Sequence, residues 1–123
     1  MHPIIEVQAQ LVAALRGDAA LAAIIAGAVF DAPPRSAAPP YVVIRRHDVV
    51  QRDGDLAPVQ EHRLLLQCWA DQPSRRRAVE MAERVVAVAL LLPVAHAEHV
   101  RTETSIDETG LARASVTLRL LTG

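Results

Sequence analysis

The 123-residue sequence has one cysteine and no lysine, and aromatic residues make up only 2% of it. A single thiol, Cys68, excludes an internal disulfide framework and a cysteine-based zinc cluster. The few aromatics leave a core to be built from Val, Leu, Ile and Ala. The 13 basic residues are all arginine and the formal net charge is −1. This balance excludes a strongly basic nucleic-acid-binding protein, because such proteins carry a clear excess of Lys and Arg.

Long hydrophobic runs are also missing. The longest uncharged stretches, residues 19–30 and 85–95, are well short of the ~20 residues that span a bilayer. The small residues at 26–28 follow a segment with two acidic residues and one arginine, which is a poor targeting signal. We therefore expect no membrane partner and no targeting segment.

The composition permits a packed core, since hydrophobic residues make up 51% of the chain and charged residues 22%. A chain of this length fits one domain, so we expect residues 1–123 to form a single domain. Composition alone indicates no activity.

Three segments have apolar residues at helical spacing. The first covers 3–15 and begins with a proline, which suits the first turn of a helix. A short helix is expected at 19–26, and an extended piece at 29–31 follows it. The clearest helix covers 74–92, and its apolar stripe predicts that it packs on a sheet.

Four segments have the residue types or the alternation of β-strands: 41–50, 62–70, 99–106 and 111–121. The first two are joined by residues 51–61, which we expect to form a long loop. A proline-rich stretch at 32–40 is interpreted as a stiff connection at the surface. The predicted fold class is α+β: a four-stranded, mainly antiparallel sheet with an amphipathic helix packed on one face, in the order α-β-β-α-β-β.

Residues with catalytic or metal-binding chemistry are sparse. His96 and Glu98 match only half of a zinc deaminase signature, since no cysteine follows Cys68 to complete it. His96, Glu98 and His99 lack the spacing of a zinc protease motif. Cys68 shares the face of its strand with leucines, which favours a core role over a reactive thiol. We expect no catalytic residue, no cofactor and no metal.

The loop at 51–60 is the first candidate for partner binding. Asp53 and Asp55 flank a glycine, which gives flexibility and negative charge, while Leu56 and Val59 are apolar and lie outside either strand's alternation. One interpretation is that this loop docks on a neighbouring ring of protein. The other is that Leu56 and Val59 fold back on their own sheet.

Consecutive arginines at Arg75, Arg76 and Arg77 are the second candidate. Positive charge at a helix N-terminus opposes the helix dipole. A partner that carries negative charge would relieve this, and so would local pairing with Asp71 or Glu80.

Leu65 and Trp69 are candidates for a subunit interface. They lie on the strand face opposite Leu64, Leu66 and Cys68, so both faces of this strand carry apolar residues. Either a second layer of the same chain, supplied by the proline segment or the first helix, covers them, or another subunit does.

Taken in order, these segments resemble the small tail-completion, or tail-terminator, proteins of long-tailed phages and gene transfer agents. The matching segments are the first helix up to residue 15, residues 20–34, residues 38–44, residues 61–69 and the helix at 76–92. The resemblance implies a homo-oligomer, a ring of six α+β subunits, that caps the tail tube. Its implied partners are the tail tube protein and the head-side connector, or stopper, protein. DNA would only pass through the lumen, and the family has no catalytic residues to carry over.

The resemblance places the protein in the virion at the junction of tail and head, after synthesis in the bacterial cytoplasm. The alternative is a small α+β enzyme or ligand-binding domain with a pocket between subunits, which would need clustered ionisable residues at strand ends. A regulatory or toxin–antitoxin module would need a basic patch or a disordered tail, and neither is evident in the sequence.

Overall fold

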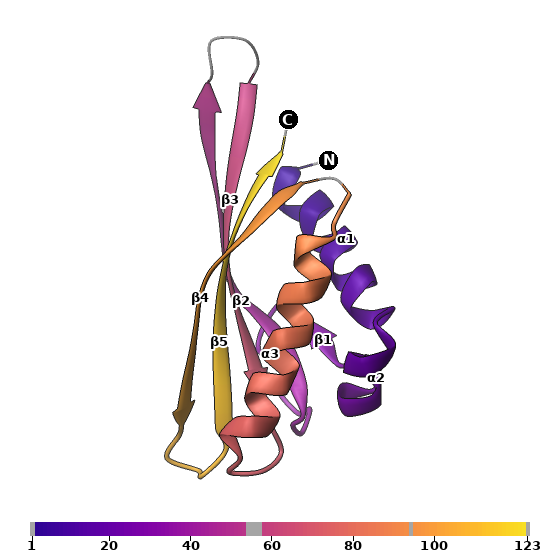
Figure 1. Cartoon of the computed structure of the whole chain (residues 1–123), viewed down its shortest axis with the longest axis vertical. Coiled ribbons are helices and arrows are strands. Elements are labelled where there is room, and N and C mark those ends of the chain that lie inside the picture. Colours follow the sequence, from indigo (N-terminus) through magenta and orange to yellow (C-terminus); the bar gives the residue numbers. More distant parts are fainter. Residues whose placement is uncertain (1, 54–57, 94, 123) are drawn as a thin grey trace.

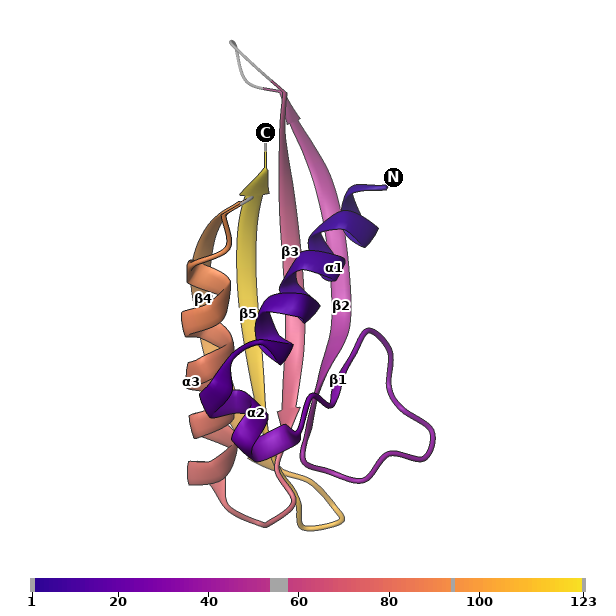
Figure 2. The ribbon, with the colours of Figure 1, turned by 90° about the vertical axis from the view of Figure 1, so that its right-hand side faces the viewer.

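The computed structural model describes residues 2–53, 58–93 and 95–122. Within these ranges the elements are α1 (Pro3–Arg16), α2 (Ala19–Ile25), β1 (Val29–Phe30), β2 (Tyr41–Asp53), β3 (Pro58–Trp69), α3 (Arg75–Leu90), β4 (His96–Ile106) and β5 (Ala112–Thr122). They form two layers, with the helices packed against one face of a sheet (Figures 1 and 2). The predicted α+β class is confirmed.

A side chain caps the first turn of each helix. His2 accepts a hydrogen bond from the backbone N–H of Ile4, Asp18 caps α2, and Ser74 caps α3 by accepting from the N–H of Arg77. None of the described helices is long and apolar enough by itself to cross a membrane. Only α1 and α2 taken together, with an 84° bend between them, reach the length and composition of one span.

The sheet has five strands in the order β1-β2-β3-β5-β4, so the expectation of four strands is wrong. The extra strand is β1, which pairs parallel with Val42 and Val43 of β2, while all the other pairs are antiparallel. Ala26 and Gly27 adopt the left-handed conformation, with φ of 50° and 80°, and turn the chain at the end of α2. The residues after this turn therefore reach the edge of β2.

The expectation of a long loop at 51–60 is also wrong, because most of these residues belong to strands. The β2–β3 ladder continues through Gln51↔Gln60 and Arg52↔Val59 to Asp53↔Pro58. Ladder hydrogen bonds need only backbone groups, so pairing continues even where the side chains have lost their apolar alternation. The ends of β2 and β3 extend past the other elements (Figure 1). We call residues 50–53 and 58–61 the β2–β3 arm.

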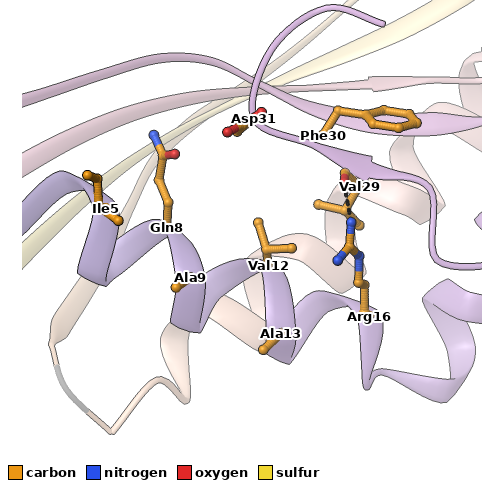
Figure 3. A pocket seen from close by; sticks show the side chains of 9 residues that line it. All are labelled: Ile5, Gln8, Ala9, Val12, Ala13, Arg16, Val29, Phe30 and Asp31. Carbon is orange, nitrogen blue, oxygen red and sulfur yellow. Dashed lines mark hydrogen bonds between the residues drawn. The ribbon is translucent and has the colours of Figure 1, made fainter.

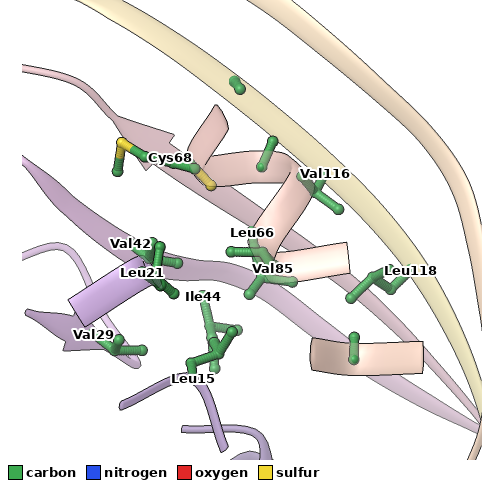
Figure 4. Close-up of a cluster of buried hydrophobic side chains, with 14 of the residues drawn as sticks. Leu15, Leu21, Val29, Val42, Ile44, Leu66, Cys68, Val85, Val116 and Leu118 are labelled. Atoms are coloured by element: carbon green, nitrogen blue, oxygen red, sulfur yellow. The ribbon is translucent and has the colours of Figure 1, made fainter. Parts of the chain in front are cut away.

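One hydrophobic cluster fills the space between the helices and the sheet (Figure 4). Fully buried members from different elements are Leu11, Leu15, Leu21, Val42, Leu66, Met81, Val85, Val116 and Leu118. Because α1 packs here, on the same side as α3, it does not cover Leu65 and Trp69. The idea that the first helix covers their face is therefore wrong, and we call that uncovered side the open sheet face.

Candidate interaction surfaces

The open sheet face is mostly polar. Arg63, Leu65 and Trp69 of β3 lie on it beside Thr117 and Arg113 of β5. Leu65 and Trp69 are partly buried although no helix covers them. The guanidinium carbon of Arg113 lies 5.1 Å from the centre of the Trp69 ring, so Arg113 covers part of that ring.

A shallow hollow of about 370 Å³ adjoins Leu65 on this face. Its rim includes charged side chains of both signs, namely Arg46, Asp48, Arg101 and Glu103. Arg46 pairs with Asp48 at 2.7 Å and Arg101 pairs with Glu103 at 3.0 Å. The charges around the hollow are thus largely neutralised within the subunit.

Glu61 lies at the centre of an arginine cluster. Its side chain is only 1% exposed, and it accepts hydrogen bonds at 2.7 Å from both Arg63 and Arg119. Arg52 lies 3.4 Å away, and Arg119 also donates to Glu98 at 3.0 Å. The hydrogen bonds from Arg119 and Arg63 lower the pKa of Glu61 to about 2. Glu61 therefore ties β3 to β2 and β5 near the base of the arm.

The sequence does not reveal Glu61 as a structural residue. It stands in a segment that looks like a loop, and its partner Arg119 is 58 positions away. The alternation of β5 places Arg119 on the polar face, and this is the one signal that points toward the pair.

The predicted docking residues fall on or near the β2–β3 arm. Asp53 is the last residue of β2, and Val59 is the second residue of β3, opposite Arg52. Asp55 and Leu56 lie outside the described residues. The structure thus places Val59 in a strand rather than in a loop, and its docking role stays a prediction.

Local pairing accounts for two of the three arginines that begin α3. Arg76 lies 3.2 Å from Glu80 and Arg77 lies 3.8 Å from it. Arg75 is exposed. Since i,i+3 and i,i+4 pairs on a helix relieve charge, an anionic partner is not needed to explain Arg76 and Arg77.

A polar cluster that the sequence did not suggest lies between α1 and the sheet. Nε2 of His47 lies 2.8 Å from Nδ1 of His62, and Gln8 of α1 lies 3.1 Å from the other nitrogen of His47. Thr122 lies 3.4 Å from His62, which is fully buried. Burial and the nearby His62 lower the pKa of His47 to about 4, and burial also lowers the pKa of His62.

These histidines predict that the protein loses stability in mild acid. In the unfolded chain His47 takes up a proton near its ordinary pKa of 6.5, whereas in the folded protein it is protonated only near pH 4. Stability is therefore fully present above pH 6.5 and falls as the pH drops toward 4. The His47→Gln variant should show a flatter melting-temperature profile between pH 7 and 5. The exposed His96→Gln variant should follow the wild type, and a profile that is equally steep in His47→Gln would contradict the assignment.

His96, Glu98 and His99, at the start of β4, do not all lie on one face of the sheet. His96 and Glu98 pair with open-face residues of β5, whereas His99 pairs with the buried Leu118 and donates to or accepts from Thr102 at 2.7 Å. No group of three or more His, Cys, Asp or Glu in the described part of the chain could hold a metal ion. Cys68 is fully buried, and burial raises the pKa of its thiol to about 12.

We therefore expect that neither Cys68 nor His96 is needed for biological activity. Cys68→Ala should lower the free energy of unfolding by about 1 kcal/mol through lost packing, and His96→Ala should leave it unchanged. Urea denaturation and an assay of particle assembly measure the two effects. Loss of assembly with normal folding in either variant would argue for chemistry at that residue.

A hollow lies between α1 and β1. It has a volume of about 520 Å³ and is lined by Ile5, Gln8, Ala9, Val12, Ala13, Arg16, Val29, Phe30 and Asp31. Apolar side chains form most of its wall, and Arg16 closes one end by donating to the carbonyl oxygen of Val29 at 3.0 Å (Figure 3). We call it the α1–β1 groove.

Comparisons with known proteins agree with this architecture. A family model described as "Tail completion protein gp17" matches residues 9–123. No curated protein matches the chain. A solved chain described as "Virion of native gene transfer agent (GTA) particle" matches with a TM-score of 0.77 and 24% identity, covering 99% of this chain and 98% of that one. At this identity the structural match shows a shared fold.

Proposed function

Because the chain belongs to the tail completion protein family and is thus a virion component of a phage or gene transfer agent, we propose that its copies form a ring that caps the tail tube. In this proposal the whole chain is one ring-forming domain. The ring joins the tail to the head-side connector, and DNA passes through its lumen. Six copies form the ring.

The β2–β3 arm is the observation that carries this proposal. Beyond the pair of Gln60 with Thr122, the two strands extend past the helices and β5, and Val50 and Val59 lie outside the hydrophobic cluster. Val59 is not needed for the packing of the subunit's own core, so another protein can contact it. The arm is therefore the proposed contact with the tail tube or the connector. Asp53 and Val59 belong to it, and the proposal also includes Asp55 and Leu56, which lie outside the described residues.

The edges of the sheet support assembly with further copies. β4 pairs only with β5, and β1 pairs with only two residues of β2, so both edges of the described sheet leave backbone donors and acceptors open. Leu65 and Trp69 on the open sheet face are proposed to adjoin a neighbouring subunit. A net charge of −1 suits a conduit through which DNA must slide.

A role in catalysis has little support. The weak cluster at β4 points to two faces of the strand, and the thiol of Cys68 is inaccessible. We therefore propose a structural role without enzymatic activity.

Native mass spectrometry of the purified protein and electron microscopy of intact particles test the ring. We expect a closed ring, in solution at high concentration or on the tail tube. If both methods find only monomers or dimers, the proposed function is wrong.

A further inference from the structure

Residues 31–40 protrude from the edge of the sheet where β1 and β2 lie (Figure 2). They contribute no member to the hydrophobic cluster and make no backbone hydrogen bond to the rest of the described chain. The two ends of this segment are held together, because the rings of Phe30 and Tyr41 meet edge to face with their centres 5.8 Å apart. We call residues 31–40 the proline loop. A loop that is anchored at both ends and adds nothing to its own core is available to a neighbouring protein.

The proline loop presents a stiff and mainly apolar surface. Seven of its ten residues are proline or alanine. Prolines restrict the backbone, so the loop loses little conformational freedom when it docks. Its charged residues are Asp31, which lines the α1–β1 groove, and Arg35, which is exposed and has no ion pair among the described residues. The loop thus offers an apolar segment with one free cation.

A hollow of about 310 Å³ lies between α3 and β4, at the other edge of the sheet. It is lined by Val79, Ala82, Glu83, Val86, His99 and Thr102. Val86 also packs against the core, whereas Val79 is 41% exposed. We call it the α3–β4 hollow. An apolar wall with a half-exposed valine is the kind of surface that another protein covers.

Glu83 is an unpaired carboxylate at this hollow. It is exposed and has no ion pair in the part of the chain that the structure describes. The adjacent Arg84 is held by Asp18, to which its Nε and Nη2 donate at 3.1 and 2.7 Å. The ring of His99 is engaged by the hydroxyl of Thr102 at 2.7 Å. The α3–β4 hollow therefore suits an apolar segment that brings a cation.

The proline loop and the α3–β4 hollow lie at similar levels along the strands. Across the paired strands, Thr102 of β4 stands level with Ile44 of β2. Ile44 is three residues from Tyr41, with which β2 begins after the loop. The two surfaces are on opposite edges of the sheet, so a rotation about an axis along the strands brings them together with little rise. A head-to-tail contact of this kind closes into a ring.

We propose that the proline loop of one copy docks on the α3–β4 hollow of the next copy. This inference rests on the proposed ring and names the surfaces that build it. In the docked arrangement the prolines and alanines cover Val79, and Arg35 pairs with Glu83. Opposite charges beside an apolar contact fix the orientation of the two copies. Each copy uses two different edges, so the contact differs from that of a two-fold dimer, in which the same patch serves both copies.

Crosslinking within assembled particles tests the contact. Ala37 and Val79 are exposed, whereas the native Cys68 is buried. Particles whose chains carry both Ala37→Cys and Val79→Cys are treated with a short bismaleimide and resolved on a denaturing gel. We expect a ladder that continues to the full ring, because each copy links to two neighbours. Each single variant should remain a monomer.

Val79→Cys combined with Glu108→Cys is the matched control. Glu108 lies in the exposed turn that follows β4, on the same edge as Val79. Residues on the same edge do not meet across a head-to-tail contact. This pair should therefore give no ladder.

An exchange of charges tests the pairing of Arg35 with Glu83. Arg35→Glu and Glu83→Arg should each prevent the ring from forming, because each places like charges opposite one another. Both changes in one chain should restore the ring, which electron microscopy counts. Glu108→Arg makes the same change at another exposed site and should leave assembly intact. Unchanged melting temperatures show that each variant folds.

The outcomes separate this inference from the proposed function. A ladder that stops at dimers shows a two-fold contact and overturns the head-to-tail arrangement. Intact rings without a ladder show that another protein covers the hollow. Rings in either single charge variant, or a double variant without rings, overturn the pairing of Arg35 with Glu83. Wild-type particles that contain no ring overturn the proposed function itself.

Discussion

Leu56→Asp combined with Val59→Asp is expected to leave the melting temperature unchanged and to abolish joined particles. Val59 lies in the β2–β3 arm, beyond the hydrophobic core, so its replacement removes little from the subunit's own packing. If the arm docks, the variant puts two charges into an apolar contact. Truncating a central interface residue costs about 2 kcal/mol or more, so two charged replacements reduce binding by roughly a thousandfold or more.

Thermal unfolding and a count of tails joined to heads measure the two effects. Ala19→Asp with Ala20→Asp is the matched control, because it adds the same charge to another exposed segment. Normal joined particles from the Leu56 and Val59 double variant would exclude a docking role for the arm. A variant that unfolds would instead place these residues in the subunit core.

The second large effect is expected from Glu61→Ala. Glu61 accepts hydrogen bonds from Arg63 and Arg119 while it is almost completely buried. Without the carboxylate, three arginines face one another at the base of the arm. Breaking such a buried pair destabilises strongly, although these arginines can turn partly to water. We expect the melting temperature to fall by roughly 5–10 °C.

Glu98→Ala is the control for this experiment. Glu98 also pairs with Arg119, but its side chain is 47% exposed, so its removal should change the melting temperature by only about 2 °C. If both variants lower the melting temperature equally, the burial of Glu61 does not add to its contribution to stability. The pKa of about 2 for Glu61 adds a pH test, since its stabilisation is present above pH 4.5 and lost as the pH falls toward 2.

Alternation of apolar and polar residues predicts a β-strand well only where one face of the strand packs on the core and the other faces water. The C-terminal strand alternates cleanly because Val116 and Leu118 face the core while Thr117 and Arg119 do not. In β2 a bulge between Ile44 and Arg46 shifts this alternation by one residue.

The sequence by itself determined the three helices, the C-terminal strand and the family resemblance, because each depends on spacing within a short segment. Tertiary structure alone decided the length of the β2–β3 arm, where both faces of the strands leave the core and the apolar signal disappears. It also decided which distant side chains meet, such as Glu61 with Arg119 and His47 with His62. These contacts depend on which strands become neighbours and in which register, and no local pattern encodes that choice.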